Sequence, residues 1–152
     1  MRSGAQSNYY LDKYLFTTRP ELLRRIAAEM AARLPGGVQR LAGPVLGAVP
    51  LVTAVSLHTG LPSLIVRVDR PKDYGTSKRI EGALQADERV LLVEDVVTTA
   101  GAALAAVDVL REAGAVILGA LVVVDREEGA AAAFAAAGLP YQALFTRTSL
   151  GL

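Results

Sequence analysis

The chain has 152 residues, 52% of them hydrophobic, and its 16 lysines and arginines nearly balance 15 aspartates and glutamates. This length suffices for one core, so we expect a single domain over residues 1–152, and the balanced charge argues against binding nucleic acid or an anionic membrane through charge alone. The lack of cysteine excludes thiolate chemistry and disulfides and suits a cytoplasmic location, while no apolar run approaches the roughly 20 residues that cross a bilayer.

The first predicted element is a helix that begins after Thr18. Thr18 can cap its N-terminus, Pro20 suits a first helical turn, and Glu21 stands at the capping-box position. The apolar residues that follow at the spacing of one helical face are Leu22, Ile26, Met30 and Leu34. This spacing predicts an amphipathic helix through residue 34.

A turn and a second helix are predicted over residues 43–60, after a short apolar stretch at residues 40–43. SLIVRV, residues 63–68, is a strand candidate rich in branched side chains. It leads into RPKDYGTSKRIEG, residues 70–82, which carries two of the three lysines of the chain, two glycines and a proline. Such a segment is either a solvated connection or a cationic loop that closes on an anion.

Two strands in the second half of the chain have apolar side chains on both faces. They are RVLLVEDV (residues 89–96) and AVILGALVVVD (residues 115–125), and a helix ending at Gly114 separates them. An alanine-rich helix at about residues 130–137 and a strand near residues 141–145 complete the pattern. Strands that alternate with helices and are apolar on both faces predict an α/β fold with a mostly parallel sheet.

The strand at residues 89–96 ends in two acids, Glu94 and Asp95, before the small and hydroxyl-bearing residues 98–102. Ligands of open parallel sheets bind beyond the carboxyl ends of the strands, where helix N-termini present free N–H groups. Acids that accept hydrogen bonds from sugar hydroxyls, next to a turn that binds phosphate, would suit a ribose 5-phosphate. The simpler alternative is that the acids and threonines only cap the helix. Neither a dinucleotide fingerprint nor a P-loop motif is present.

The run VLLVEDVVTTAGAA resembles the phosphoribosyl-diphosphate (PRPP) motif of type I phosphoribosyltransferases. SGAQSNYYLD (residues 3–12), GPVLGAVPL (43–51), KDYGTSKRIEG (72–82) and DREEG (125–129) are similar to segments of the orotate phosphoribosyltransferases, in the same order. The resemblance implies a type I phosphoribosyltransferase fold, which is Rossmann-like, with a short N-terminal hood and a flexible catalytic loop. It also implies a homodimer in which the loop of one subunit reaches the site of the other.

The resemblance further implies roles for individual residues. Lys72 and Asp95 would be catalytic, and orotate would contact Tyr10, Leu11, Thr98 and Arg126. PRPP would be bound by Lys72, Tyr74, Glu94, Asp95, Val96, Val97, Thr98, Thr99, Ala100, Gly101 and Ala102. Mg²⁺ is implied as the cofactor, held on the diphosphate of PRPP without direct protein ligands.

The sequence departs from the family pattern just before the loop and at the turn on the diphosphate side. Val68 and Asp69 stand where the family has an Arg-Lys pair, and Gly47 stands where some members carry a lysine. Two alternatives to an orotate enzyme therefore stay open. One is the same fold acting on another base, against which the carboxylate-binding Arg126 argues. The other is a PRPP-sensing regulatory protein without turnover.

Overall fold

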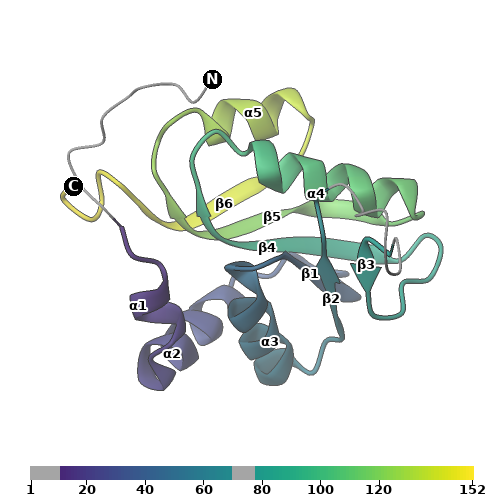
Figure 1. Ribbon diagram of the computed structural model, residues 1–152, viewed down its shortest axis with the longest axis horizontal. Helices are drawn as coiled ribbons and strands as arrows, with labels where there is room; N and C mark the ends of the chain where they lie inside the picture. Colours follow the sequence, from purple (N-terminus) through teal and green to yellow (C-terminus); the bar gives the residue numbers. More distant parts are fainter. Residues whose placement is uncertain (1–10, 70–77) are drawn as a thin grey trace.

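The computed structural model describes residues 11–69 and 78–152, so the predictions made for Tyr10, Lys72 and Tyr74 lie outside the described residues. A six-stranded sheet in the order β3-β2-β1-β4-β5-β6 forms its centre (Figure 1). The strands are β1 (Arg40–Pro44), β2 (Ser63–Val66), β3 (Ile80–Glu81), β4 (Arg89–Val97), β5 (Val116–Asp125) and β6 (Tyr141–Thr146). All neighbours pair in parallel except β2 and β3, which are antiparallel.

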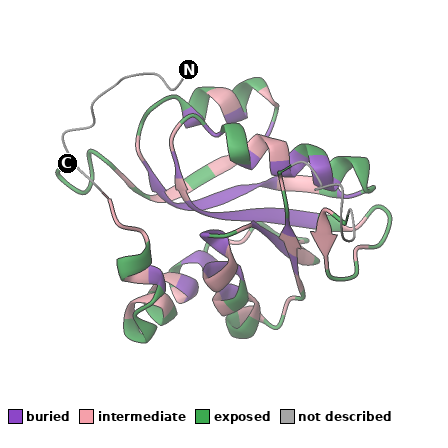
Figure 2. Ribbon diagram, in the orientation of Figure 1, coloured by how far each residue is buried: buried purple, intermediate pink, exposed green. Residues whose placement is uncertain are grey.

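Helices cover both faces of the sheet (Figure 1). On one face lie α4 (Gly101–Glu112) and α5 (Ala130–Ala136), and on the other lie α1 (Tyr14–Thr17), α2 (Pro20–Ala31) and α3 (Ala48–Thr59). Two separate apolar clusters fill the two spaces between helices and sheet. The central strands β4 and β5 are buried along most of their length (Figure 2), which confirms the prediction of a mostly parallel sheet covered on both sides.

The alternation of side chains along β4 distributes its residues between the two clusters. Val90 and Leu92 pack in the cluster under α4, and Leu91 and Val93 pack in the cluster under α2 and α3. At the end of the strand, the Asp95 carboxylate lies on the α3 side, beside Gly47, the N-cap residue of α3.

Most predicted elements occur at the expected positions, but the predicted cap of α2 is wrong. Its N-cap residue is Arg19, without a side-chain cap, and the Thr18 hydroxyl instead donates to the carbonyl of Tyr14. The reason is the short helix α1, which was not predicted and which brings the Tyr14 carbonyl within reach of Thr18. The helix α3 ends as expected at Gly60, whose φ of 76° suits glycine.

Strand β1 was not predicted as a strand, because five residues that end in glycine and proline give little periodicity. Its Gly43 is required by packing: a Cβ there would lie 2.8 Å from Cγ1 of Val52 in α3. The close approach lets α3 lie directly on the sheet. No helix within residues 11–69 and 78–152 has the length and apolar character that a membrane span requires.

Candidate active site

The predicted site residues of β4, of the turn after it and of the segment after β5 lie at one edge of the sheet, because the carboxyl ends of parallel strands lie together. In the β4–β5 pairing, Val97 stands opposite Asp125, and the backbone N–H of Arg126 donates to the carbonyl of Val97 at 3.0 Å. The acids of β4, the turn into α4 and the segment after β5 therefore share this edge. The edge is the place where an α/β sheet of this type binds its ligands.

Glu94 and Asp95 are both buried, with 7% and 1% of their surface exposed. The N–H of Asp95 donates to Oε1 of Glu94 at 3.1 Å, and the N–H of Val96 donates to Oδ1 of Asp95 at 2.7 Å. Burial, followed by the hydrogen bond and charge of Asp95, raises the pKa of Glu94 well above its ordinary value, although Lys13 acts in the opposite direction. The end of β4 thus holds two carboxyl groups where water does not stabilise their charged forms.

Asp95 has a counter-charge that the sequence did not reveal. Nζ of Lys13 lies 3.0 Å from Oδ2 of Asp95, and the Lys13 side chain is 36% exposed. Burial lowers the pKa of Lys13, but the hydrogen bond and charge of Asp95 outweigh it, so that the pKa is raised. Among the described residues, no well-aligned donor forms a hydrogen bond with Oδ2 of Asp95, although the Lys13 ammonium group lies beside it. The lone pairs of Oδ2 can therefore accept further hydrogen bonds.

The turn that leads from β4 into α4 has the geometry of an anion site. Ala100 is the N-cap residue, with a φ of 66° in the left-handed region and no side-chain cap for the helix. The first N–H groups of α4 are therefore not used by a capping side chain, and the helix dipole favours an anion there. Along the turn, Val97 and Ala100 are buried, Val96 and Thr98 are half-buried, and Thr99, Gly101 and Ala102 are exposed.

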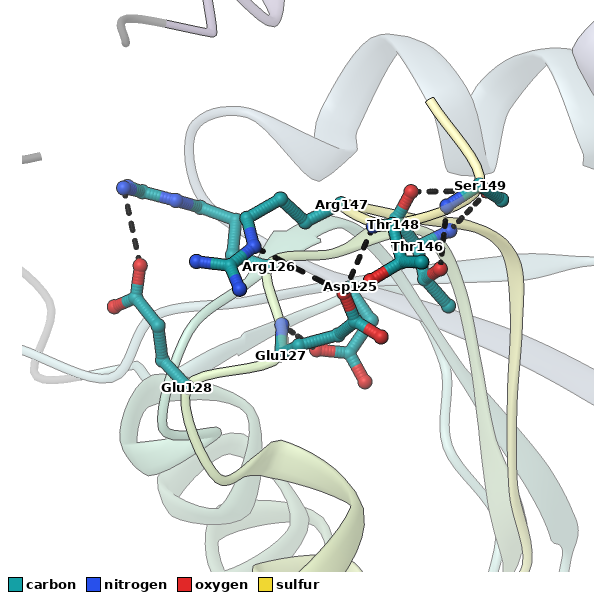
Figure 3. A network of polar contacts seen from close by, with 8 residues as sticks. All are labelled: Asp125, Arg126, Glu127, Glu128, Thr146, Arg147, Thr148 and Ser149. Carbon is teal, nitrogen blue, oxygen red and sulfur yellow. Dashed lines mark hydrogen bonds and ion pairs between the residues drawn. The ribbon is translucent and has the colours of Figure 1, made fainter. Parts of the chain in front are cut away.

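The segment DREEG forms a tight turn after β5 (Figure 3). Asp125 accepts the N–H of Glu127 at 2.7 Å, and an ion pair of 3.0 Å joins Arg126 to Glu128. The side chain of Arg126 is 24% exposed and points away from the end of β6 (Figure 3). A planar guanidinium in this position can offer two parallel N–H groups to a carboxylate.

The turn after β6 supports the DREEG segment. The carboxylate of Glu127 accepts the N–H and the hydroxyl of Thr148, at 2.8 and 2.6 Å, and lies 3.9 Å from Nε of Arg147 (Figure 3). These hydrogen bonds lower the pKa of Glu127. They also hold Glu127 at a φ of 58°, which is uncommon for a residue with a side chain. The turn therefore fixes the backbone from which Arg126 projects.

Leu11 and the residues around the loop complete the description of the predicted site. Leu11 is half-buried against the cluster under α2 and α3. At the base of the loop, the N–H of Arg67 donates to the carbonyl of Arg79 at 2.8 Å, and the Arg79 guanidinium donates to the carbonyl of Val68 at 3.4 Å. Val68 itself packs against the cluster under α4. The guanidinium of Arg79 thus places a positive charge next to the backbone of Val68.

Replacing Glu94 with glutamine should stabilise the ligand-free protein above neutral pH. Because folding raises the pKa of Glu94, its contribution to stability is complete below the unfolded pKa and is lost as the pH rises through the folded pKa. Thermal unfolding of both proteins should show a higher Tm for Glu94→Gln at about pH 8, and a difference that vanishes below about pH 4. An equal difference at every pH would contradict this assignment.

Comparison with known proteins supplies the family. The model of the phosphoribosyl transferase domain matches residues 18–134. The orotate phosphoribosyltransferase of Halobacterium salinarum is 48% identical over 147 residues, which are 97% of this chain and 83% of that protein. That of Pyrococcus horikoshii is 51% identical over 133 residues, which are 86% of this chain and 71% of that protein. The chain belongs to the orotate phosphoribosyltransferase family.

A solved structure of the family supports the same conclusion. The orotate phosphoribosyltransferase of Mycobacterium tuberculosis H37Rv in complex with PRPP superposes with a TM-score of 0.77 and 35% identity, covering 95% of this chain and 85% of that chain. The type I phosphoribosyltransferase fold and the family that the sequence motifs indicated are thereby confirmed. The roles of individual residues of this family member stay predictions.

Proposed function

We propose that this family member transfers the ribose 5-phosphate of PRPP to N1 of orotate, giving orotidine 5′-monophosphate and diphosphate, as a step of pyrimidine nucleotide synthesis. The observation that carries this proposal is the shared sheet edge, where two buried acids, a helix start without a capping side chain and a half-buried guanidinium lie together. The relatives of the chain are orotate phosphoribosyltransferases. The acids suit the ribose hydroxyls, the helix start suits the 5-phosphate, and the guanidinium suits the carboxylate of orotate.

PRPP would be bound by its ribose and its 5-phosphate. Glu94 and Asp95 would accept hydrogen bonds from the ribose 2′- and 3′-hydroxyls, and residues 98–102 would bind the 5-phosphate through the N–H groups at the start of α4. Val96 and Val97 link the two parts, so the spacing between acids and turn sets the position of the ribose. Ribose C1 would then face the edge of the sheet on which Arg126 lies.

Orotate would be held by its carboxylate and its ring. Arg126 would bind the carboxylate with a bidentate pair of hydrogen bonds, while Thr98, Leu11 and Tyr10 would contact the pyrimidine. N1 would release its proton to solvent and form a bond to C1 of the ribose, as the bond from C1 to the diphosphate breaks and its electron pair leaves with the diphosphate. The sugar is cationic in the transition state, so exclusion of water by the loop at residues 70–82 would protect it from hydrolysis.

Magnesium and a partner subunit are part of the proposal. A Mg²⁺ ion would be held by the diphosphate oxygens of PRPP, the hard ligands that this ion prefers. When bound, it would offset negative charge on the leaving diphosphate. In a homodimer, Lys72 and Tyr74 of the loop would reach the diphosphate in the neighbouring site. A single domain and a cytoplasmic location stay predictions.

A comparison of bases tests the choice of substrate. The protein with PRPP and Mg²⁺ should consume orotate, and should consume uracil, adenine and hypoxanthine at rates lower by at least about 100-fold, because these bases lack the carboxylate that Arg126 would bind. Faster consumption of adenine or hypoxanthine than of orotate would favour the same fold acting on another base. PRPP binding without consumption of any base would favour the regulatory alternative.

Replacing Arg126 with alanine should raise the KM for orotate by about 10- to 100-fold, the value of a charged hydrogen-bonded pair. The KM for PRPP should change by less than about twofold, because Arg126 would contact only the base. The KM for orotate of Arg126→Lys should lie between those of Arg126→Ala and the unmodified protein, since lysine keeps the positive charge but lacks the planar guanidinium group. Steady-state kinetics with each substrate varied in turn gives both constants.

Glu128→Gln is the matched control for Arg126. It removes the ion pair of Arg126 that the structure shows but leaves the guanidinium in place. The KM for orotate should therefore stay the same or fall in this variant. An Arg126→Ala variant with the orotate KM of the unmodified protein would remove Arg126 from the base site.

A further inference from the structure

We propose that Lys13 is a PRPP-positioning residue, whose ammonium group lies over Gly47 and holds the Asp95 carboxylate toward the ribose. This inference rests on the proposed function, because it assigns a new residue to the same PRPP site. The ion pair joins the segment before α1 to the end of β4, which are far apart in the sequence. Lys13 would act on the substrate through Asp95.

The space for this ion pair exists because residue 47 is glycine. A Cβ at Gly47 would lie 2.0 Å from Oδ2 of Asp95 and 2.6 Å from Nζ of Lys13. Both distances are far below a van der Waals contact, so any side chain there would displace the carboxylate or the ammonium group. Gly47 is the N-cap residue of α3, so the ion pair lies against the start of that helix. The three residues therefore form one unit.

The negative charge around Asp95 is stabilised by a nearby cation. Glu94 and Asp95 are adjacent acids that are both buried, and PRPP brings further negative charge. An unpaired carboxylate with 1% exposure would be costly to keep ionised. Lys13 offsets that charge on the α3 side of the sheet. Because it contacts Oδ2, it also selects one rotamer of Asp95 and leaves lone pairs of the carboxylate for the ribose hydroxyls.

The ion pair of Lys13 and Asp95 also connects the proposed PRPP site with the proposed orotate site. Lys13 is two residues after Leu11, which is expected to contact orotate. The backbone that carries Leu11 is thus anchored to Asp95 of the PRPP site by an ion pair with one fully buried partner. Loss of Lys13 should consequently weaken PRPP binding first and orotate binding through it.

Calorimetric titration with PRPP of Lys13→Met, Lys13→Arg and the unmodified protein tests the inference. Lys13→Met should raise the Kd for PRPP by about 10- to 100-fold, and Lys13→Arg should recover most of that loss, since it restores the cation. Inorganic phosphate, which would use only residues 98–102, should bind Lys13→Met as it binds the unmodified protein. Arg33→Met is the control, because it removes a cation from an exposed ion pair with Glu29 and should leave PRPP binding unchanged.

A double-mutant cycle with Asp95→Asn tests whether Lys13 acts through Asp95. Lys13→Met should weaken PRPP binding in the unmodified protein and should have a much smaller effect in the Asp95→Asn background, because the ion pair is already lost there. Lys13→Met binding PRPP within twofold of the unmodified protein, or strictly additive effects in the cycle, would overturn the inference. Since the measurement is PRPP binding, a protein that binds PRPP without consuming orotate would refute the proposed function and leave this test intact.

Discussion

Replacing Lys72 with alanine should lower kcat for orotate consumption by roughly 10²- to 10³-fold, the range measured when a charge-stabilising group is removed from an active site. The resemblance assigns Lys72 to the loop that closes on the diphosphate, where a cation would offset the charge of the leaving group. The residue belongs to a polar loop, so its loss should leave Tm nearly unchanged. Steady-state kinetics and thermal unfolding of the variant measure both effects.

Lys78→Ala is the matched control for this prediction. Lys78 is the other lysine of the loop, and its Nζ lies 3.5 Å from Oε2 of Glu81, the last residue of β3. Its ammonium group is therefore placed at the base of the loop, and kcat should stay within about threefold of the unmodified protein. Equal turnover in Lys72→Ala and the unmodified protein would exclude the loop lysine from the mechanism.

Mixing two inactive variants tests whether the loop acts in the partner subunit. If Lys72 serves the neighbouring site, a hybrid of one Lys72→Ala subunit and one Asp95→Asn subunit has one site with both residues intact. Random equal mixing makes half of the dimers hybrid, so about a quarter of the sites should recover activity. No recovery after subunit exchange would mean that each loop serves its own subunit.

Replacing Asp95 with asparagine should lower kcat/KM for PRPP by about 30- to 1,000-fold, the range for removing one partner of a buried, hydrogen-bonded charge pair. The change removes a carboxylate acceptor for the ribose and leaves Lys13 facing a neutral amide. Glu94→Gln removes the neighbouring charge without separating this ion pair, and it should have the smaller effect. A larger loss in Glu94→Gln than in Asp95→Asn would reverse the roles assigned to the two acids.

The long, regular elements of the fold could be predicted because the pattern of apolar residues in each of them is typical of a strand or a helix. The strands β4 and β5 are continuous apolar runs, and α4 follows β4 with small residues that suit a helix start. The two-residue strand β3 could not be predicted, because it exists only through its antiparallel pairing with β2. The cap of α2 was predicted wrongly because α1, one turn long, offers Thr18 another acceptor.

The candidate site divides in the same way between local and distant features. Glu94, Asp95 and the turn at residues 98–102 form one continuous motif, and DREEG is another, so both were recognised from the sequence. Lys13 was missed because its partner Asp95 becomes its neighbour only when the sheet has formed and α3 lies on it. The available signals were the scarcity of lysine and a glycine at position 47, and neither identifies an ion pair without the fold.

The central claim, transfer of ribose 5-phosphate from PRPP to orotate, is tested most directly by identifying the products. The protein incubated with orotate, PRPP and Mg²⁺ should form orotidine 5′-monophosphate and diphosphate in equal amounts, at the expense of both substrates. Chromatography with mass-spectrometric detection measures all four compounds in one reaction. Binding of PRPP at saturation without any orotidine 5′-monophosphate would contradict the account, as would release of diphosphate with free ribose 5-phosphate as its counterpart.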